Sequence, residues 1–181
     1  MDARTRLIAE LREHALILGE VTLTSGAVAQ YYVDCKRATL RPPGFAAMSE
    51  LVAAEVALRG ATAAGGLTMG ADPVACAALA GGADVKAFFI RKDAKQHGLQ
   101  RKIEGPDLNS DDRCLVVEDV VTTGGSTLQA IAALQEAGHT IVGVVSILDR
   151  LAGGGAKIEA AAGAPYTALT TIDDVHPDRD K

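Results

Sequence analysis

Several features are scarce or missing in this sequence, and each absence excludes a class of protein. Long apolar runs are missing: the longest strongly apolar stretch, IVGVVSIL, covers residues 141–148 and is far too short to cross a bilayer as a helix. Basic residues are not in excess, because the net charge is −5 and the pI is about 5.3, which argues against a general nucleic-acid or membrane surface. An anionic ligand must therefore be held by local charge.

Cysteine is also scarce. Cys35, Cys76 and Cys114 form no CxxC pair and leave one over in any disulfide scheme, which favours a reducing compartment, and we interpret all three as structural. The N-terminal stretch MDARTRLIAELREHALIL places charges among its apolar residues, where a signal peptide has an unbroken apolar core. We therefore expect a cytoplasmic protein that binds neither membranes nor nucleic acid.

The motifs of several enzyme classes are absent as well. The sequence has no GxxxxGK followed by Ser or Thr, no GxGxxG after a predicted strand and no GxSxG. The four histidines show no metal-ligand spacing: His14, His97, His139 and His176. These absences disfavour P-loop and dinucleotide sites, serine hydrolases with a nucleophile elbow, and direct zinc sites.

What is present suits one globular domain, because 181 residues with 48% hydrophobic content can bury a substantial core. Apolar residues at helical spacing over residues 7–18 predict a first helix that ends near Gly19. A hairpin should follow, with its turn at Ser25 and Gly26, and then a helix over residues 46–58.

Strands and helices alternate along the rest of the chain. Strands are expected within residues 61–70, 85–90, 114–117 and 141–148, and helices after Pro73 and over residues 126–137. This alternation predicts an α/β fold, a mostly parallel sheet covered by helices, in which residues 114–148 form one right-handed βαβ unit. Residues 151–163 should form a loop and a short helix, and the tail from His176 should fray.

The stretch CLVVEDVVTTGGSTLQAIAAL, residues 114–134, carries the first candidate site, because ligands of a parallel sheet gather beyond the carboxyl ends of its strands. Residues 122–127 combine hydroxyls and glycines before a helix whose free N–H groups attract phosphate, although an ordinary capped turn has the same composition. Glu118 and Asp119 would repel a lone phosphate unless the ligand also brought hydroxyl donors or a divalent cation. A phosphorylated ribose with Mg²⁺ brings both.

This block resembles the signature with which class I phosphoribosyltransferases bind 5-phosphoribosyl 1-pyrophosphate (PRPP). The resemblance implies a single domain over residues 1–181, with a core of about five parallel strands and a small hood formed mainly by about residues 1–40. It also implies that a nitrogen base displaces pyrophosphate in a Mg²⁺-dependent reaction, with Asp119 catalytic and in contact with the metal through water. The implied PRPP-binding residues of this block are Glu118, Asp119, Val120, Val121, Thr122, Thr123, Gly124, Gly125 and Ser126.

Residues 88–105, FFIRKDAKQHGLQRKIEG, hold five basic residues against one acid between positions 91 and 102. A charge run of this kind is commonly a solvated loop. The pattern RKxxKxHG, which starts at Arg91, resembles the mobile loop of orotate phosphoribosyltransferases. That resemblance implies a homodimer with shared active sites, in which Arg91, Lys92, Lys95 and His97 of one subunit bind PRPP in the other. Lys95 and His97 would be catalytic, because cations can neutralise the charge of the departing pyrophosphate.

Two further stretches fit the same family. In SILDR, Arg150 at a strand end matches the Arg that binds the carboxylate of orotate, and Thr122 matches a residue that also contacts the base. In GGLTMGADP, residues 65–73, the family places its pyrophosphate loop, although an ordinary strand-to-helix turn fits this stretch equally well. The resemblance thus implies transfer of the phosphoribosyl group from PRPP to orotate, giving orotidine 5′-monophosphate and pyrophosphate in pyrimidine biosynthesis.

Some positions depart from the family pattern. Thr24 stands where the family often has Lys, so that one cation is missing, for which Lys36 or Arg37 could substitute. Tyr31 and Tyr32 match an aromatic pair only approximately, and packing of the hood explains them slightly better than base contact. Two alternative functions stay open: a phosphoribosyltransferase for another base, and a non-catalytic PRPP-sensing regulator that binds nucleic acid, against which the acidic pI counts.

Overall fold

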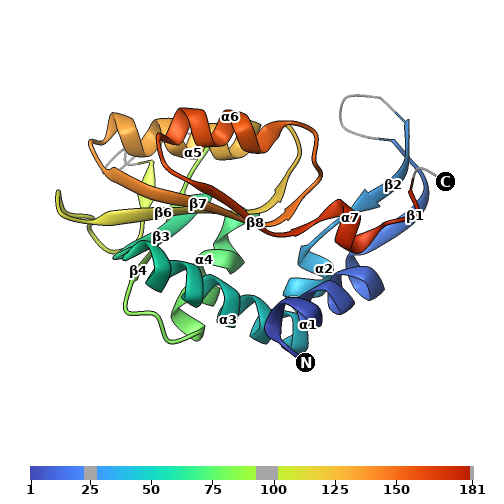
Figure 1. Cartoon of the computed structure of the whole chain (residues 1–181). Coiled ribbons are helices and arrows are strands. Elements are labelled where there is room, and N and C mark those ends of the chain that lie inside the picture. The colour runs from blue at the N-terminus through green and yellow to red at the C-terminus, as the bar shows by residue number, and fades with distance from the viewer. Residues whose placement is uncertain (23–27, 93–101, 180–181) are drawn as a thin grey trace.

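The computed structural model describes residues 1–22, 28–92 and 102–179, and its core is a six-stranded sheet in the order β5-β4-β3-β6-β7-β8 (Figure 1). The strands are β3 (Ala63–Leu67), β4 (Lys86–Ile90), β5 (Ile103–Glu104), β6 (Arg113–Val121), β7 (Thr140–Asp149) and β8 (Tyr166–Thr171). Among these, β5 pairs antiparallel with β4, and every other pairing is parallel. The predicted α/β fold with a mostly parallel central sheet is confirmed.

Helices cover both faces of this sheet. α3 (Pro42–Arg59) and α4 (Ala71–Ala80) pack on one face, and α5 (Gly125–Glu136) and α6 (Gly154–Ala162) pack on the other (Figure 1). Because successive residues of a strand point to opposite faces, β6 contributes to both layers. Leu115 and Val117 belong to the core beneath α3 and α4, whereas Cys114 and Val116 belong to the core beneath α5 and α6. The strand that carries Glu118 and Asp119 is therefore fixed from both sides.

Two of these helices begin earlier than the sequence analysis expects. α3 begins at Pro42 and not at residue 46. Proline is tolerated there because the N–H groups of a first helical turn have no partner within the helix, so the missing N–H of proline costs no hydrogen bond. α4 begins at Ala71, so that Pro73 lies within its first turn for the same reason.

A two-stranded sheet lies beside the main one. α1 (Ala3–Glu10) continues into a π-helical turn, η1 (Leu11–Ala15), which leads to β1 (Leu16–Thr22). β1 pairs antiparallel with β2 (Val28–Val33), and α2 (Lys36–Thr39) follows. The prediction of a helix as far as Gly19 is wrong for residues 16–19, which belong to β1, because residues 16–18 pair with β2 and satisfy their backbone groups in a sheet. The predicted turn at Ser25 and Gly26 lies outside the described residues.

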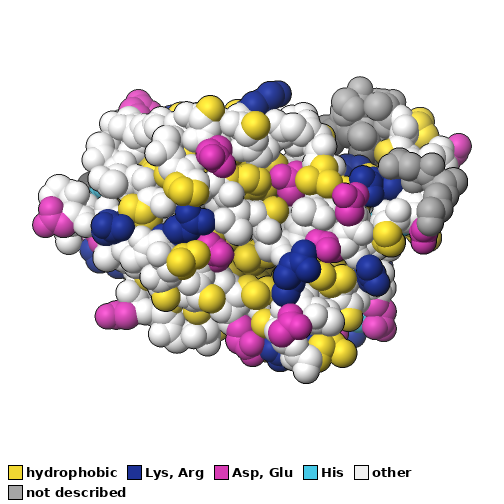
Figure 2. Space-filling view, viewed as in Figure 1, with side chains coloured by type: hydrophobic (Ala, Val, Ile, Leu, Met, Phe, Trp, Pro, Cys, Tyr) yellow, Lys and Arg dark blue, Asp and Glu magenta, His cyan; other side chains and the backbone are white. Residues whose placement is uncertain are grey.

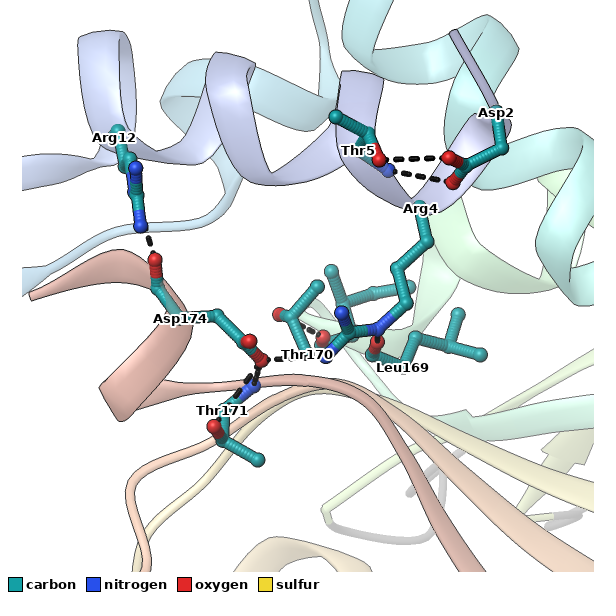
Figure 3. A network of polar contacts seen from close by, with 9 residues as sticks. Asp2, Arg4, Thr5, Arg12, Leu169, Thr170, Thr171 and Asp174 are labelled. Atoms are coloured by element: carbon teal, nitrogen blue, oxygen red, sulfur yellow. Dashed lines mark hydrogen bonds and ion pairs between the residues drawn. The ribbon is translucent and has the colours of Figure 1, made fainter. Parts of the chain in front are cut away.

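The C-terminal segment packs against this N-terminal unit (Figure 3). The strand β8, which no local sequence pattern predicts, runs beside β7 and leads into α7 (Ile172–Val175). Arg4 of α1 donates to the carbonyl of Leu169 at 3.0 Å and to the carboxylate of Asp174 at 2.7 Å, and Arg12 donates to the carbonyl of Asp174 at 2.7 Å. The expected fraying is wrong for His176, which packs against Tyr31, and for Arg179, which pairs with Asp173 and donates to the carbonyl of His176.

The surface mixes charges of both signs. Figure 2 shows basic and acidic side chains interspersed over one face of the molecule. None of the described helices combines the length and the apolar character that a membrane span requires.

Candidate active site

Glu118 lies almost at the carboxyl end of β6 and is 4% exposed. Its carboxyl accepts hydrogen bonds from the Thr127 hydroxyl at 3.2 Å and from the Asp119 amide at 3.1 Å. Burial, and next the charge of Asp119, raise the pKa of Glu118 well above its ordinary value of 4.5. A carboxyl in this setting carries a proton more readily than an exposed one, and hydroxyl donors from a ligand would favour its ionised form.

The turn after β6 leaves a helix N-terminus open. Gly124 precedes α5 with a φ of +86°, a left-handed conformation that favours glycine, and no side chain caps the helix there. Gly125 and Ser126 are exposed. The first N–H groups of α5 are therefore available to an anion such as a phosphate.

The first turn of α6 packs closely against the turn after β6. A Cβ added to Gly154 would lie 2.5 Å from the carbonyl oxygen of Thr122 and 2.9 Å from the amide nitrogen of Gly124. A Cβ on Gly124 would in turn lie 3.1 Å from Cγ1 of Ile158. Close packing of α6 thus sets the position of the turn at residues 122–124.

Asp119 is held on two sides. Its Oδ1 accepts the Val120 amide at 2.8 Å, and its Oδ2 lies 3.2 Å from Nζ of Lys36. Lys36 also pairs with Oδ1 of Asp34 at 2.9 Å. A Cβ on Gly70 would clash with the Asp119 carboxylate, so the backbone of the predicted pyrophosphate loop lies directly against it.

Arg150 follows β7 at the same edge of the sheet, where its amide donates to the carbonyl of Val121 at 2.8 Å. Its guanidinium carbon lies 4.9 Å from the ring centroid of Tyr31, close enough for a cation–π contact. The Tyr31 ring meets the ring of His176 edge-on, at 5.2 Å and 78°. Nε of Arg150 is buried without a hydrogen-bond partner among the described residues.

A buried polar network fixes the turn after Arg150. Asp149 accepts the Leu151 amide at 2.7 Å and the Tyr166 hydroxyl at 2.9 Å, and that hydroxyl lies 2.7 Å from Oγ of Ser146. Burial first, and then the charge of Asp149, raise the pKa of Tyr166. The phenol therefore keeps its proton as a donor.

The predicted loop residues are described in part. Arg91 and Lys92 follow β4, where they line a hollow of about 390 Å³ together with Thr68, Phe89 and Glu104. The amide of Arg91 donates to the carbonyl of Lys102 at 2.9 Å, which places the two ends of the loop side by side. Lys95 and His97 lie outside the described residues, as does Thr24.

The structure thus brings the predicted residues of β6, the following turn and Arg150 to one edge of the sheet. Sequence reasoning missed Gly154 and Tyr166, and it did not decide between Lys36 and Arg37. The run GGG at residues 153–155 was an available signal, because adjacent glycines commonly mark a close backbone approach. Lys36 has no such signal, since its partner Asp119 is 83 positions away.

Comparison with known proteins adds an independent finding. A sequence model of the family described as phosphoribosyl transferase domain matches residues 62–163, which run from the approach to β3 to the end of α6. An orotate phosphoribosyltransferase of Corynebacterium glutamicum (strain R) is 48% identical over 176 residues, which cover 97% of this chain and 95% of that protein.

Solved structures agree with the sequence matches. The orotate phosphoribosyltransferase of Mycobacterium tuberculosis H37Rv superposes with a TM-score of 0.86 at 42% identity, covering 96% of this chain and 99% of that one. A second crystal structure of that enzyme, in complex with PRPP, gives a TM-score of 0.82 at 37% identity, over 96% of this chain and 98% of that one.

Proposed function

This chain belongs to the phosphoribosyltransferase family, among the orotate phosphoribosyltransferases, and we propose that its residues act in four roles within a Mg²⁺-dependent homodimer. The enzyme transfers the phosphoribosyl group from PRPP to orotate, giving orotidine 5′-monophosphate and pyrophosphate in pyrimidine biosynthesis. The observation that carries the assignment of roles is a convergence at one sheet edge. There an uncapped helix N-terminus, a pair of carboxylates and Arg150 lie together.

The first role is to hold the phosphoribosyl group. The residues from Thr122 to Ser126 surround the N-terminus of α5, where backbone N–H groups would bind the 5′-phosphate. Glu118 and Asp119 would accept hydrogen bonds from the ribose hydroxyls, and such donors stabilise ionised carboxylates. Two anchored ends would hold the anomeric carbon in a fixed position for substitution.

The second role is to stabilise the leaving group. As the bond between the anomeric carbon and oxygen breaks, its electron pair stays on pyrophosphate, and a ring nitrogen of orotate forms the new bond to carbon. We propose that Arg91, Lys92, Lys95 and His97 neutralise this charge from across a dimer interface. Arg91 and Lys92 follow β4 and line a hollow with Thr68, which belongs to the predicted pyrophosphate loop of the same chain, so the predicted basic loop begins at the edge of the sheet that carries the site.

The third role concerns Mg²⁺, which would neutralise part of the pyrophosphate charge when bound. Among the described residues no group of three or more His, Cys, Asp or Glu side chains is placed to hold a metal ion. Asp119 fits contact through water better than direct ligation, because its Oδ1 accepts a backbone amide and its Oδ2 faces Lys36. We therefore propose Asp119 as an indirect metal contact, with the substrate's own oxygens as the main ligands.

The fourth role is selection of the base. Arg150 has the planar donor pair that binds a carboxylate in bidentate fashion, and Tyr31 supports the guanidinium. Thr122 lies beside it, because Val121 pairs with Asp149 in the sheet. We propose that these two residues bind orotate. We also propose a cytoplasmic location, which the three free cysteines support.

The test is the loss of orotate ultraviolet absorbance when the purified chain is mixed with orotate and PRPP, with and without Mg²⁺. Loss that requires the metal and releases pyrophosphate is expected. Binding of PRPP without loss of orotate would point to another base or to a PRPP-sensing regulator. If a chelator that removes all Mg²⁺ leaves the rate of orotate loss unchanged, the metal has no part in the reaction.

A further inference from the structure

Lys36 reaches the active site from the N-terminal unit. It is the first residue of α2, the short helix that follows β2, and its Nζ lies 3.2 Å from Oδ2 of Asp119 on β6 and 2.9 Å from Oδ1 of Asp34. The side chain of Lys36 is 36% exposed, and that of Asp119 is 14% exposed. One cation thus bridges two carboxylates at the opening of the site.

The predicted pyrophosphate loop has no cation of its own. Residues 68–72 read TMGAD, in which Asp72 adds a negative charge and accepts the Thr68 hydroxyl at 2.7 Å. Asp119 stands directly beside this loop, because a Cβ on Gly70 would lie 3.0 Å from Oδ2, the oxygen that faces Lys36. Pyrophosphate at this loop would meet carboxylates unless a nearby cation offset them.

The ammonium group of Lys36 supplies a cation beside Oδ2 of Asp119, next to this loop. Burial alone would lower the pKa of Lys36, but hydrogen bonds and charge from Asp34 and Asp119 outweigh it and raise the pKa. The ammonium group therefore stays charged at any physiological pH. Lys36 has two carboxylate partners. If ribose hydroxyls replace it at Asp119, its ion pair with Asp34 still holds it beside the loop.

We propose, on the basis of the phosphoribosyl-transfer function, that Lys36 binds the pyrophosphate group of PRPP and supplies the cation absent at Thr24. Before the substrate binds, Asp119 holds Lys36 in place. When PRPP binds, its ribose hydroxyls replace Lys36 at Asp119, and the ammonium group donates to pyrophosphate oxygens. Lys36 is thus a substrate-binding residue whose ion pair is exchanged during binding.

The test compares the affinities of the full chain for PRPP and for ribose 5-phosphate, which lacks pyrophosphate, by calorimetry. Lys36→Met should lower PRPP affinity by about tenfold or more, as expected for a charged hydrogen bond, and leave ribose 5-phosphate affinity undiminished. Lys36→Arg should restore most of the loss. Lys157→Met removes the same charge from an exposed position of α6 and should change neither affinity.

Other outcomes would overturn the inference. Equal losses for both ligands would make Lys36 a structural residue, and a loss of PRPP affinity in Arg37→Met but not in Lys36→Met would assign the cation to Arg37. Thermal unfolding checks that each variant folds, and Lys36→Gln, which keeps a donor without charge, serves if the Met variant does not. A wild-type chain that binds PRPP without consuming orotate would reject the proposed function while leaving the affinity comparison valid.

Discussion

The buried carboxyl of Glu118 gives the site a dependence on pH. Its pKa is raised by burial and by Asp119, so the folded chain binds a proton there that the unfolded chain releases above about pH 4.5. The stability that this proton provides is present at low pH and is lost as the pH rises from the ordinary pKa toward the raised one. Ligand hydroxyls that favour the ionised form would oppose this loss.

Replacement of the carboxyl by an amide should therefore change stability in a pH-dependent way. Relative to wild type, Glu118→Gln should gain roughly 1–2 kcal/mol in free energy of unfolding between pH 5 and pH 7, because the amide does not ionise. Denaturant titrations at several pH values measure this difference. Glu20→Gln, an exposed position of β1, is the control, and parallel curves for wild type and Glu118→Gln would contradict the assigned cause.

Arg150 should determine the affinity for orotate alone. Arg150→Met is expected to raise KM for orotate by about tenfold or more and to leave KM for PRPP nearly unchanged, because a bidentate charged pair is lost at the base only. Steady-state kinetics with each substrate varied in turn measures both constants. Arg41→Met, at the exposed start of α3, is the matched control; an equal rise of both constants would show a general disturbance of the site.

The sequence predicts the positions of those site residues that belong to one local motif. The positions of Glu118, Asp119 and Thr122 beside a helix N-terminus follow from a local strand-turn-helix pattern. Lys36 and Gly154 could not be placed in this way, because each contacts the site through tertiary packing.

Among the elements, α6 has a supporting function, which the run GGG at residues 153–155 suggests without naming the segment that it contacts. The Ala- and Gly-rich stretch at residues 151–163 reads as a loop with a short helix, and the helix is present as Gly154–Ala162. Its first turn lies so close to the turn at residues 122–124, the proposed phosphate site, that only a glycine fits at position 154. The element therefore sets the shape of a site to which it contributes no side chain.

Gly154→Ala should disturb that shape. The new Cβ would lie 2.5 Å from the Thr122 carbonyl oxygen, so the turn must shift, at a cost of about 1–3 kcal/mol and with weaker PRPP binding. Calorimetry and thermal unfolding measure the two effects. Gly163→Ala, at the other end of α6, has a φ of +61° but open space, and it should lower stability by about 1–2 kcal/mol without changing PRPP affinity. Unchanged PRPP affinity in Gly154→Ala would exclude the supporting function.

The errors in the predicted elements have a common cause. Residues 16–18 have helical spacing, yet they pair with β2, and β8 was missed although it completes the sheet beside β7. In both cases the partner strand decides the structure, and a partner is not visible in a local pattern. The long unit of β6, α5 and β7 was predicted well because its pattern is local and strongly apolar.

Across the whole molecule, three distant segments meet at the proposed base site. Tyr31 comes from β2, Arg150 follows β7, and His176 follows α7, which Arg4 and Arg12 hold against the N-terminal helices (Figure 3). The alternation of strands and helices predicts the sheet, but contacts between residues 165 positions apart leave no periodic trace in the sequence.

His176 should therefore influence base binding without touching the phosphoribosyl site. His176→Ala is expected to raise KM for orotate about two- to tenfold with little change for PRPP, because the edge-on contact that orients Tyr31 under Arg150 is lost. His176→Phe keeps an aromatic edge and should restore the wild-type value. His139→Ala, before β7 at the opposite end of the sheet, is the control, and a failure of Phe to rescue would refute the orienting role.

The division of the site between two parts of the chain also bears on how such enzymes diverge. The proposed cradle for phosphate and ribose comes from one continuous unit, β6 with α5, whereas the residues beside Arg150 come from the two ends of the chain. Mutations in the terminal segments can therefore alter the choice of base while the sugar phosphate remains held.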